Sequence, residues 1–223
     1  MTAGPHTPRL QTGLTVLDRP ARRSPALHRL ALAELAERDG AVYWLDARNE
    51  ASTYALYDLA PSRARLSDVR VARAFTAYQH HELVREVART AGDAGLVVAP
   101  CVASLYRDDD VPEWEAADLL ESSLAVLSGL AESFDAPVLT TADRDASGPY
   151  ADLLADRADA EIECTRTDAG LKYVADDFET TVYFDEGFWQ TTIPYWVELL
   201  GAVVEDDPAV AAEAVRLADR VGV

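Results

Sequence analysis

Four polar residues near the start of the chain could together bind an anion. Arg22, Arg23 and Ser24 come directly before a predicted helix, and Arg48 follows a predicted strand that could bring it nearby. The N-terminus of a helix attracts negative charge, and arginine forms paired hydrogen bonds with phosphate and carboxylate groups. These residues are therefore candidates for a nucleotide- or anion-binding site. In the alternative interpretation, the arginines are solvated or pair with some of the many carboxylates of the chain.

No other group of residues has the spacing of a metal or catalytic site. His80 and His81 are adjacent, so on a helix their side chains point about 100° apart, and Glu82 does not complete a ligand set. Residues 108–110 are aspartates without the alternating ligands and glycine of a calcium loop, and their charge suits the start of a following helix. The chain has no G-x-S-x-G motif. We therefore expect no catalytic residue, no metal site and no cofactor.

Aromatic side chains gather near the C-terminus, where Phe188, Trp189, Tyr195 and Trp196 lie within one short stretch. Burial in the core is the commoner role of such a cluster. Tryptophan and tyrosine are also enriched at the hot spots of protein interfaces. These four residues are therefore candidates for a partner-binding patch, with core packing as the alternative.

Short apolar runs alternate with stretches of helical periodicity along most of the chain. The apolar runs predict strands at 14–17, 41–45, 69–75, 95–99 and 137–141, and the periodic stretches predict helices at 25–39, 81–91 and 112–134. Strands that alternate with helices are typical of βαβ units, in which a mainly parallel sheet is covered on both faces. The predicted fold class is a three-layer α/β/α domain.

The last third of the chain has a different pattern. Residues 160–165 and 170–174 alternate between polar and apolar side chains and are joined by a short turn, and a further strand is predicted at 180–184. We expect an antiparallel meander that extends the sheet. The predicted organisation is a flexible tail at 1–8, one α/β domain at 9–205 and a C-terminal helix packed on it at 206–223.

Several segments, in this order, resemble the ATPase core of the RecA/RadA recombinase superfamily, which includes the KaiC-like proteins. The resemblance covers about residues 10–184 and implies a RecA-like fold. The segments are LQTGLTVLD at 10–18, DVRVARAF at 68–75 with QHHELV at 79–84, LVVAPCVASLYR at 96–107 and GLAESFDAPVLTT at 129–141.

The same resemblance shows where this chain lacks the family's ATPase residues. The phosphate-binding loop falls on residues 18–26, DRPARRSPA, which hold no glycine or lysine but two prolines that lack an N–H. Phosphoryl transfer depends on such groups for positioning and charge stabilisation, so the resemblance implies a pseudo-ATPase. The magnesium-shell aspartate falls on Pro100, the water-activating glutamate near Arg48, and the Asn-Gln pair that senses the γ-phosphate on Ala142 and Asp143.

The resemblance therefore implies an inactive RecA/RadA-like subunit that binds a protein, in DNA recombination and repair or in KaiC-like signalling. The expected partner is an active homologue or a second copy of the chain. One alternative is a nucleotide- or anion-sensing protein that uses the crevice at the C-terminal ends of the strands. The other is a self-assembling structural subunit. Acidic and small residues replace the family's DNA-binding loop at 143–152, so we expect no direct DNA binding.

Composition and charge indicate the environment of the protein. The 223 residues carry a net charge of −19, and Lys172 is the only lysine, which is typical of proteins from extreme halophiles. An acidic domain that meets a basic partner is the alternative. Cys101 and Cys164 are too few for a disulfide framework. The chain shows no membrane span, signal peptide or transit sequence, so we expect a cytoplasmic protein that does not bind membranes.

Overall fold

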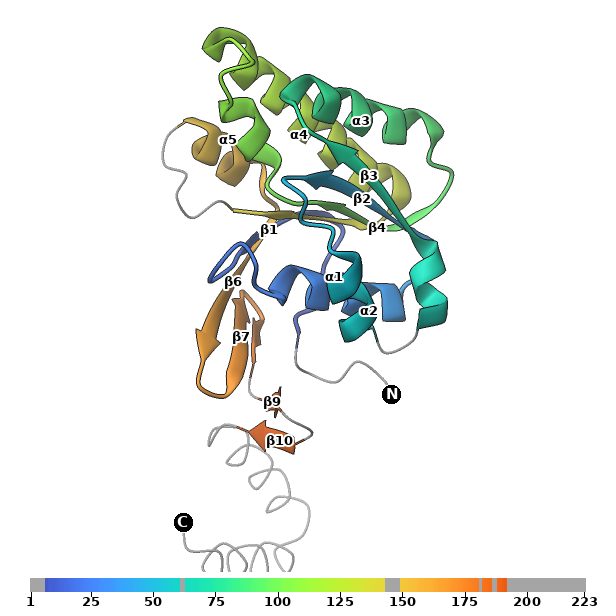
Figure 1. The fold of residues 1–223 in the computed structure, drawn as a ribbon, viewed down its shortest axis with the longest axis vertical. Coiled ribbons are helices and arrows are strands. Elements are labelled where there is room, and N and C mark those ends of the chain that lie inside the picture. Colours follow the sequence, from blue (N-terminus) through green and yellow to red (C-terminus); the bar gives the residue numbers. More distant parts are fainter. Residues whose placement is uncertain (1–6, 61–62, 143–148, 181, 186–187, 192–223) are drawn as a thin grey trace, which may run out of the picture.

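A single eight-stranded sheet, covered by helices on both faces, forms the centre of the computed structural model (Figure 1). The structure describes residues 7–60, 63–142, 149–180, 182–185 and 188–191, with side chains up to residue 180. Its helices are α1 Ala26–Glu37, α2 Thr53–Leu59, η1 Arg63–Asp68, α3 Ala77–Thr90, η2 Val102–Arg107, α4 Glu113–Phe134 and α5 Pro149–Arg157. Its strands are β1 Gly13–Asp18, β2 Ala41–Ala47, β3 Val69–Ala74, β4 Ala94–Ala99, β5 Pro137–Thr141, β6 Ala160–Thr167, β7 Gly170–Ala175, β8 Phe178–Glu179, β9 Val182–Asp185 and β10 Phe188–Thr191.

The strand order is β3-β2-β4-β5-β1-β6-β7-β8. Strands β1 to β6 are parallel, and β7 and β8 are antiparallel to their neighbours. Strand β1 therefore lies inside the sheet, between β5 and β6, although it comes first along the chain. Because β1 to β5 run in one direction, the chain leaves all five at the same edge, which is where ligands bind in open α/β sheets.

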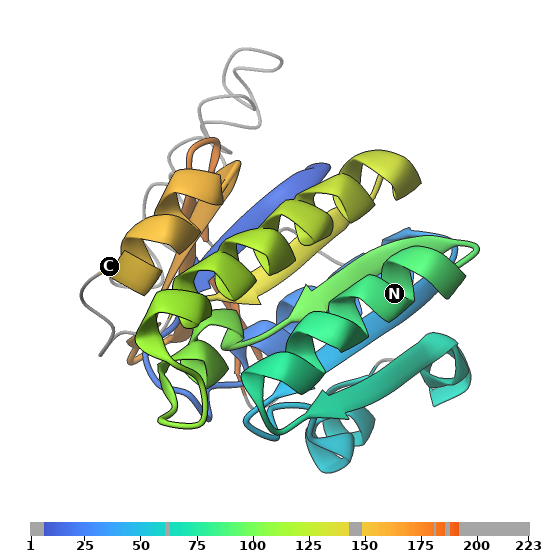
Figure 2. The ribbon, with the colours of Figure 1, turned by 90° about the horizontal axis from the view of Figure 1, so that it is seen from above.

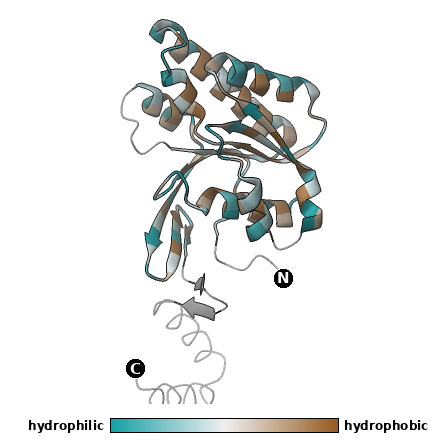
Figure 3. Ribbon diagram, in the orientation of Figure 1, coloured by the Kyte–Doolittle hydropathy of each residue, from teal (hydrophilic) through white to brown (hydrophobic). Residues whose placement is uncertain are grey.

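Helices α3, α4 and α5 cover one face of the sheet, and α1 and α2 cover the other (Figures 1 and 2). Each face has its own hydrophobic cluster. Leu120, Leu124 and Leu127 of α4 belong to one cluster, and Leu27 and Leu30 of α1 belong to the other. The helices turn apolar stripes toward the sheet and hydrophilic faces outward (Figure 3). The predicted three-layer α/β/α class is confirmed.

Burial along the strands follows from how each strand is covered. All residues of β4 and β5 are buried, as expected of parallel strands with helices on both faces. Buried and exposed residues alternate along most of β6, which forms an antiparallel hairpin with β7. None of the described helices has the length and apolar character needed to cross a membrane.

The C-terminal strands differ in part from the predicted meander. The sheet ends in the short strand β8, and β9 pairs with β10 in a separate antiparallel pair, in place of a third meander strand at 180–184. Helices α2 and α5 were not expected from the periodicity, because each is short and has only one buried residue, Leu56 and Leu154 respectively. The predicted helix at 206–223 and the first six residues of the predicted tail lie outside the described residues.

Candidate functional site

Arginines converge on one pocket at the edge where the chain leaves β1, β2, β4 and β5. The pocket has a volume of about 550 Å³, and we call it the arginine pocket. Its size falls in the range typical of small-molecule sites. It is lined by Arg19, Pro20, Ala21, Arg22, Arg48, Cys101, Ser104, Arg107, Asp108 and Ala142.

Arg19 lines the pocket and forms a buried ion pair with Glu50, which does not line it. Nη1 of Arg19 donates to Oε2 of Glu50 at 2.6 Å, and the two side chains are only 4% and 6% exposed. Arg22 donates through Nε to the other carboxylate oxygen of Glu50, also at 2.6 Å. One carboxylate thus bridges two guanidinium groups. A bound anion would accept hydrogen bonds from two arginines in the same way.

Asp46 fixes the position of Glu50. The Asp46 carboxylate is fully buried at the end of β2 and accepts hydrogen bonds from the backbone N–H of Glu50 at 2.7 Å and of Ala51 at 3.1 Å. Its second oxygen accepts from Nε of Arg73, on the neighbouring strand β3, at 3.0 Å. The loop after β2 is therefore held by a fully hydrogen-bonded network, which a buried charge requires.

Arg48 is also bonded to protein groups. Its guanidinium donates to the hydroxyl and the backbone carbonyl of Ser104, and it forms an ion pair with Asp108 at 2.5 Å. The Arg48 carbonyl accepts a hydrogen bond from Nη2 of Arg22 at 2.7 Å. The structure therefore favours the interpretation in which Arg22 and Arg48 pair with groups of the chain itself.

Left-handed backbone conformations cluster around this pocket. Arg48, Asn49 and Cys101 have φ angles of 63°, 60° and 53°, and Asp135 is the only other non-glycine residue with positive φ in the described chain. Such conformations cost energy for residues with a Cβ, and they concentrate where a loop must aim groups at a site. The loops that follow β2 and β4 both contain residues in this left-handed conformation.

Cys101 lies at the bottom of the pocket but is not activated. Burial raises the pKa of its thiol above the ordinary value. Its sulfur accepts a hydrogen bond from Nη2 of Arg19 at 3.3 Å, and its backbone N–H donates to the Thr141 hydroxyl at 2.9 Å. A thiol with a raised pKa is a poor nucleophile near neutral pH, so the structure assigns Cys101 to packing.

The structure separates the four residues predicted to bind an anion. Arg22 and Arg48 line the arginine pocket, whereas Arg23 is exposed and does not line it. The Ser24 hydroxyl accepts a hydrogen bond from the backbone N–H of Ala26, at the start of α1, at 3.3 Å. The sequence interpretation missed Arg19, which directly follows β1. It also missed Glu50, because carboxylates are too abundant in this chain for one to be singled out.

The paired histidines belong to a buried hydrogen-bond chain. Nδ1 of His80 lies 2.9 Å from the Tyr106 hydroxyl, which lies 2.8 Å from the Ser123 hydroxyl, and Nδ1 of His81 lies 2.9 Å from the same Ser123 oxygen. Burial lowers the pKa of His80 to about 4, so the ring is neutral at neutral pH. Within the described residues no group of His, Cys, Asp or Glu could hold a metal ion.

Three exposed aromatic residues lie near the starts of α3 and α4, and we call them the aromatic patch: Phe75, Tyr78 and Trp114. Their exposed fractions are 72%, 42% and 76%. The Tyr78 hydroxyl donates to the Glu115 carboxylate at 2.8 Å, which joins the two helix starts. Sequence analysis pointed instead to Phe188, Trp189, Tyr195 and Trp196, whose side chains lie outside the described part of the chain.

Comparison with known proteins adds no relative: no protein-family model and no curated protein sequence matches the chain.

Proposed function

We propose that this chain has a RecA-like fold, has lost ATP hydrolysis, and acts as a protein-binding or regulatory subunit in recombination and repair or in KaiC-like signalling. Four positions assigned by resemblance support the RecA-like part. They lie at 18–26, 48, 100 and 142, far apart in the sequence, yet all lie in or next to the arginine pocket. A nucleotide-hydrolysing ancestor would need these positions together, because all of them act on one triphosphate.

The Glu50 carboxylate is the observation that carries the loss of ATP hydrolysis. It contacts Arg19 and Arg22, which belong to the segment that stands where the family has its phosphate-binding loop. A nucleotide phosphate would have to compete with this carboxylate for the two arginines, and like charges would repel. Pro100 also offers no carboxylate for a magnesium shell, and Arg48 has the wrong charge to activate water.

The aromatic patch supports protein binding. It lies beside the edge strand β3, at the same edge of the sheet as the arginine pocket. Large exposed aromatic side chains that lie close together mark protein interaction sites, and tryptophan and tyrosine are common hot spots. By resemblance, RecA-like domains assemble side by side, so we assign the partner as an active RecA-like homologue from the same cell.

The test uses the purified chain, the purified homologue and light scattering coupled to gel filtration in molar KCl. We expect a stable complex and a changed rate of ATP hydrolysis by the homologue. The double variant Phe75→Ser/Trp114→Ser should weaken the complex at least about tenfold, because each residue is an exposed aromatic anchor. The control Tyr54→Ser removes an exposed aromatic residue on α2, outside the patch, and should bind normally.

Two results would contradict this proposal. One is ATP hydrolysis by the chain alone that depends on Arg19. The other is the absence of any complex, together with an unchanged rate of the homologue. A complex of the chain with itself alone would instead support the self-assembling structural subunit.

A second candidate function is anion or nucleotide sensing. Four arginines line the arginine pocket, although the chain as a whole carries a charge of −19. Thermal unfolding in molar KCl with inorganic phosphate, ATP, ADP or a cyclic nucleotide tests it. A stabilisation of several degrees that is lost in Arg48→Ala would favour sensing over a purely protein-binding role.

A further inference from the structure

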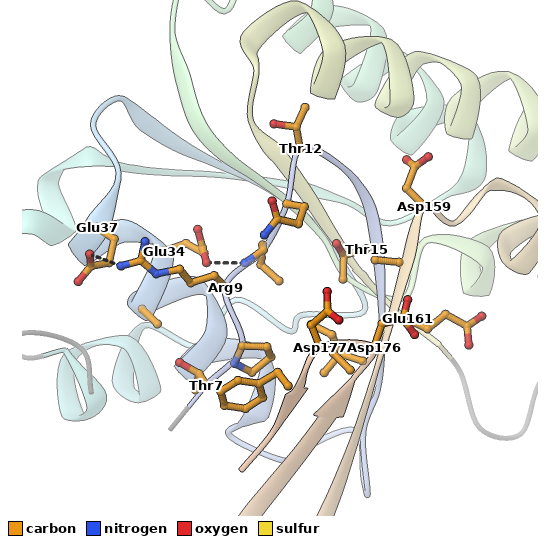
Figure 4. Close-up of a pocket in the computed structure, with 18 residues that line it drawn as sticks. Thr7, Arg9, Thr12, Thr15, Glu34, Glu37, Asp159, Glu161, Asp176 and Asp177 are labelled. Atoms are coloured by element: carbon orange, nitrogen blue, oxygen red, sulfur yellow. Dashed lines mark hydrogen bonds and ion pairs between the residues drawn. The ribbon is translucent and has the colours of Figure 1, made fainter. Parts of the chain in front are cut away.

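A second cavity, of about 660 Å³, lies beside the segment before β1 and the start of β6 (Figure 4). Two of its lining groups are bonded to other lining residues: Arg9 pairs with Glu37 at 3.2 Å, and the Glu34 carboxylate accepts from the backbone N–H of Leu10 at 2.8 Å. Within the described residues, none of the buried side-chain atoms that lack a hydrogen-bond partner lines this cavity. One of those atoms, Nε2 of His80, belongs instead to the buried hydrogen-bond chain between α3 and α4.

The hydrogen-bond chain has three contacts and a limited supply of hydrogens. Nδ1 of His80 lies 2.9 Å from the Tyr106 hydroxyl. The Ser123 hydroxyl lies 2.8 Å from the Tyr106 hydroxyl and 2.9 Å from Nδ1 of His81. Each contact needs one hydrogen, and each of the two hydroxyls supplies one. The third hydrogen must therefore come from Nδ1 of one histidine, because two such hydrogens would be one too many and none would leave a contact unmade.

The chain can run in two directions when both rings are neutral. In the first direction, Nδ1–H of His80 donates and Nδ1 of His81 accepts. In the second, His81 donates and His80 accepts, so the hydrogen of His80 lies on Nε2, which is buried and has no partner among the described residues. Nε2 of His81 is on a half-buried ring and is not such an atom. Buried N–H groups without an acceptor are rarer than buried acceptors without a donor, so the first direction is favoured.

Protonation of His81 leaves only the second direction. A protonated ring has N–H on both nitrogens, so Nδ1 of His81 must donate to Ser123. Ser123 then donates to Tyr106, and Tyr106 donates to Nδ1 of His80. The hydrogen of His80 must then lie on Nε2. The charge of a half-buried ring thus sets the tautomer of a ring that is fully buried.

His81 takes up a proton more readily than His80. Burial lowers the pKa of His80 to about 4, and apart from burial only His81 acts on it. Burial and, next, Arg85 lower the pKa of His81 from its ordinary value, whereas Glu82 and the backbone of Leu119 raise it. Within the described residues, the elements packed against α3, which are β2, β3, η2 and α4, add no charged group to these.

We propose that the hydrogen-bond chain is a proton-sensing relay, in which protonation of His81 switches the buried His80 from its Nδ1–H to its Nε2–H tautomer. The relay passes through Tyr106, which lies on η2. Ser104 of the same turn bonds to Arg48 at the arginine pocket through its hydroxyl and its carbonyl. The relay thus reverses the direction of a hydroxyl on an element that lines that pocket. It does not depend on the RecA-like proposal.

The test is nitrogen-15 NMR of the histidine side chains in the full chain, in molar KCl from about pH 8 to about pH 5. The nitrogen shifts of a ring distinguish its two neutral tautomers from each other and from the charged form. We expect His80 to carry its hydrogen mainly on Nδ1 at the upper end of this range. As His81 titrates, the shifts of the two His80 nitrogens should exchange with the same midpoint, while His80 stays neutral.

Two variants break the relay at different points. Ser123→Ala removes the link between the histidines, so His81 should still titrate while His80 keeps one tautomer throughout. His81→Gln changes a half-buried side chain and removes the titrating ring, so it should also abolish the exchange. The matched control Ser122→Ala removes an exposed hydroxyl from α4 and should leave the exchange intact.

Two results would overturn the relay. One is a natural chain in which the tautomer of His80 does not change while His81 titrates. The other is an exchange that persists in Ser123→Ala or in His81→Gln, because the signal would then reach His80 by another route.

Discussion

Glu50 is the shared counter-charge of two arginines that line the arginine pocket. It neutralises Arg19, which is almost completely buried, and it holds Arg22 against the same carboxylate. A buried guanidinium without a counter-charge is unfavourable, because desolvation is no longer offset. Arg19, Arg22 and Glu50 therefore stabilise one another as one ion-pair network, although they come from two loops.

Replacement of Glu50 tests how much this ion-pair network contributes to the stability of the folded protein. We expect Glu50→Gln to lower the free energy of unfolding by about 3 kcal/mol, because it leaves a buried charge uncompensated. Denaturant unfolding in molar KCl measures the loss. In the control Glu121→Gln, the exposed pair with Arg157 is broken, and the loss should be at most about 0.5 kcal/mol. Equal stability of Glu50→Gln and the natural chain would contradict the prediction.

His80 gives the protein a specific sensitivity to acid. Its pKa is near 6.5 in the unfolded chain and about 4 in the folded protein, because burial disfavours the charged ring. Between these values the unfolded state binds a proton that the folded state does not. Stability therefore falls as pH falls from 6.5 to 4, by about 3 kcal/mol from this residue.

Unfolding free energies measured across this pH window test the role of His80. The variant His80→Gln should lose that part of the pH dependence, whatever its stability at neutral pH. His28, whose pKa is also lowered by burial, stays in place as an internal reference. An unchanged slope in His80→Gln would assign the acid sensitivity to other groups.

At the scale of elements, β2 and β4 depend on a glycine at their start. Ala41 pairs with Ala94 and Val42 with Leu96, so Gly95 is an extra residue in the ladder. A Cβ on Gly95 would lie 2.2 Å from the Asp39 carbonyl oxygen. The segment after α1 thus passes close to β4 only because this side chain is absent.

Two alanine substitutions should act in opposite directions. Gly95→Ala should destabilise the protein by about 2 kcal/mol, because the backbone must move away. Gly129→Ala, in α4, meets nothing within 4 Å and should stabilise it by about 0.5 kcal/mol through helix propensity. Thermal unfolding of both variants provides the measurement. A Gly95→Ala variant that is as stable as the natural chain would contradict the prediction, because it would show that the backbone can move without cost.

At the scale of the whole molecule, the excess of acidic residues is the main long-range electrostatic feature. A net charge of −19 produces mutual repulsion between the acidic side chains, which acts over longer distances than a single ion pair such as Arg19–Glu50. Salt screens such repulsion, and the screening length shortens to about 3 Å at molar concentration. The folded state should therefore require salt.

The unfolding midpoint should rise by at least about 10 °C from low salt to molar KCl, because repulsion is the dominant long-range term. Scanning calorimetry at several KCl concentrations measures the rise. Sucrose at equal osmolality is the control for excluded-solute effects, and should give a smaller rise. A midpoint that does not depend on KCl would contradict the halophilic interpretation of the composition.

The sequence by itself determined the three longest helices, strands β1 to β5 and the fold class. The runs at 95–99 and 137–141 became fully buried parallel strands, and the leucine stripe of 112–134 became α4. These features are local, because periodicity records which face of an element is buried. The strand at 180–184 was mistaken as part of the sheet, because alternation does not say which strand is the neighbour.

Only the tertiary structure decided what the arginines do. Arg19 and Glu50 are 31 residues apart, and their contact exists because β1 and β2 end at the same edge of the sheet. The sequence made Arg22 and Arg48 candidates for an anion site but could not show that Glu50 and Asp108 already pair with them. With so many acidic residues, composition cannot select Glu50. The folded backbone positions Glu50 next to the arginines, because the backbone N–H of Glu50 donates a hydrogen bond to the Asp46 carboxylate.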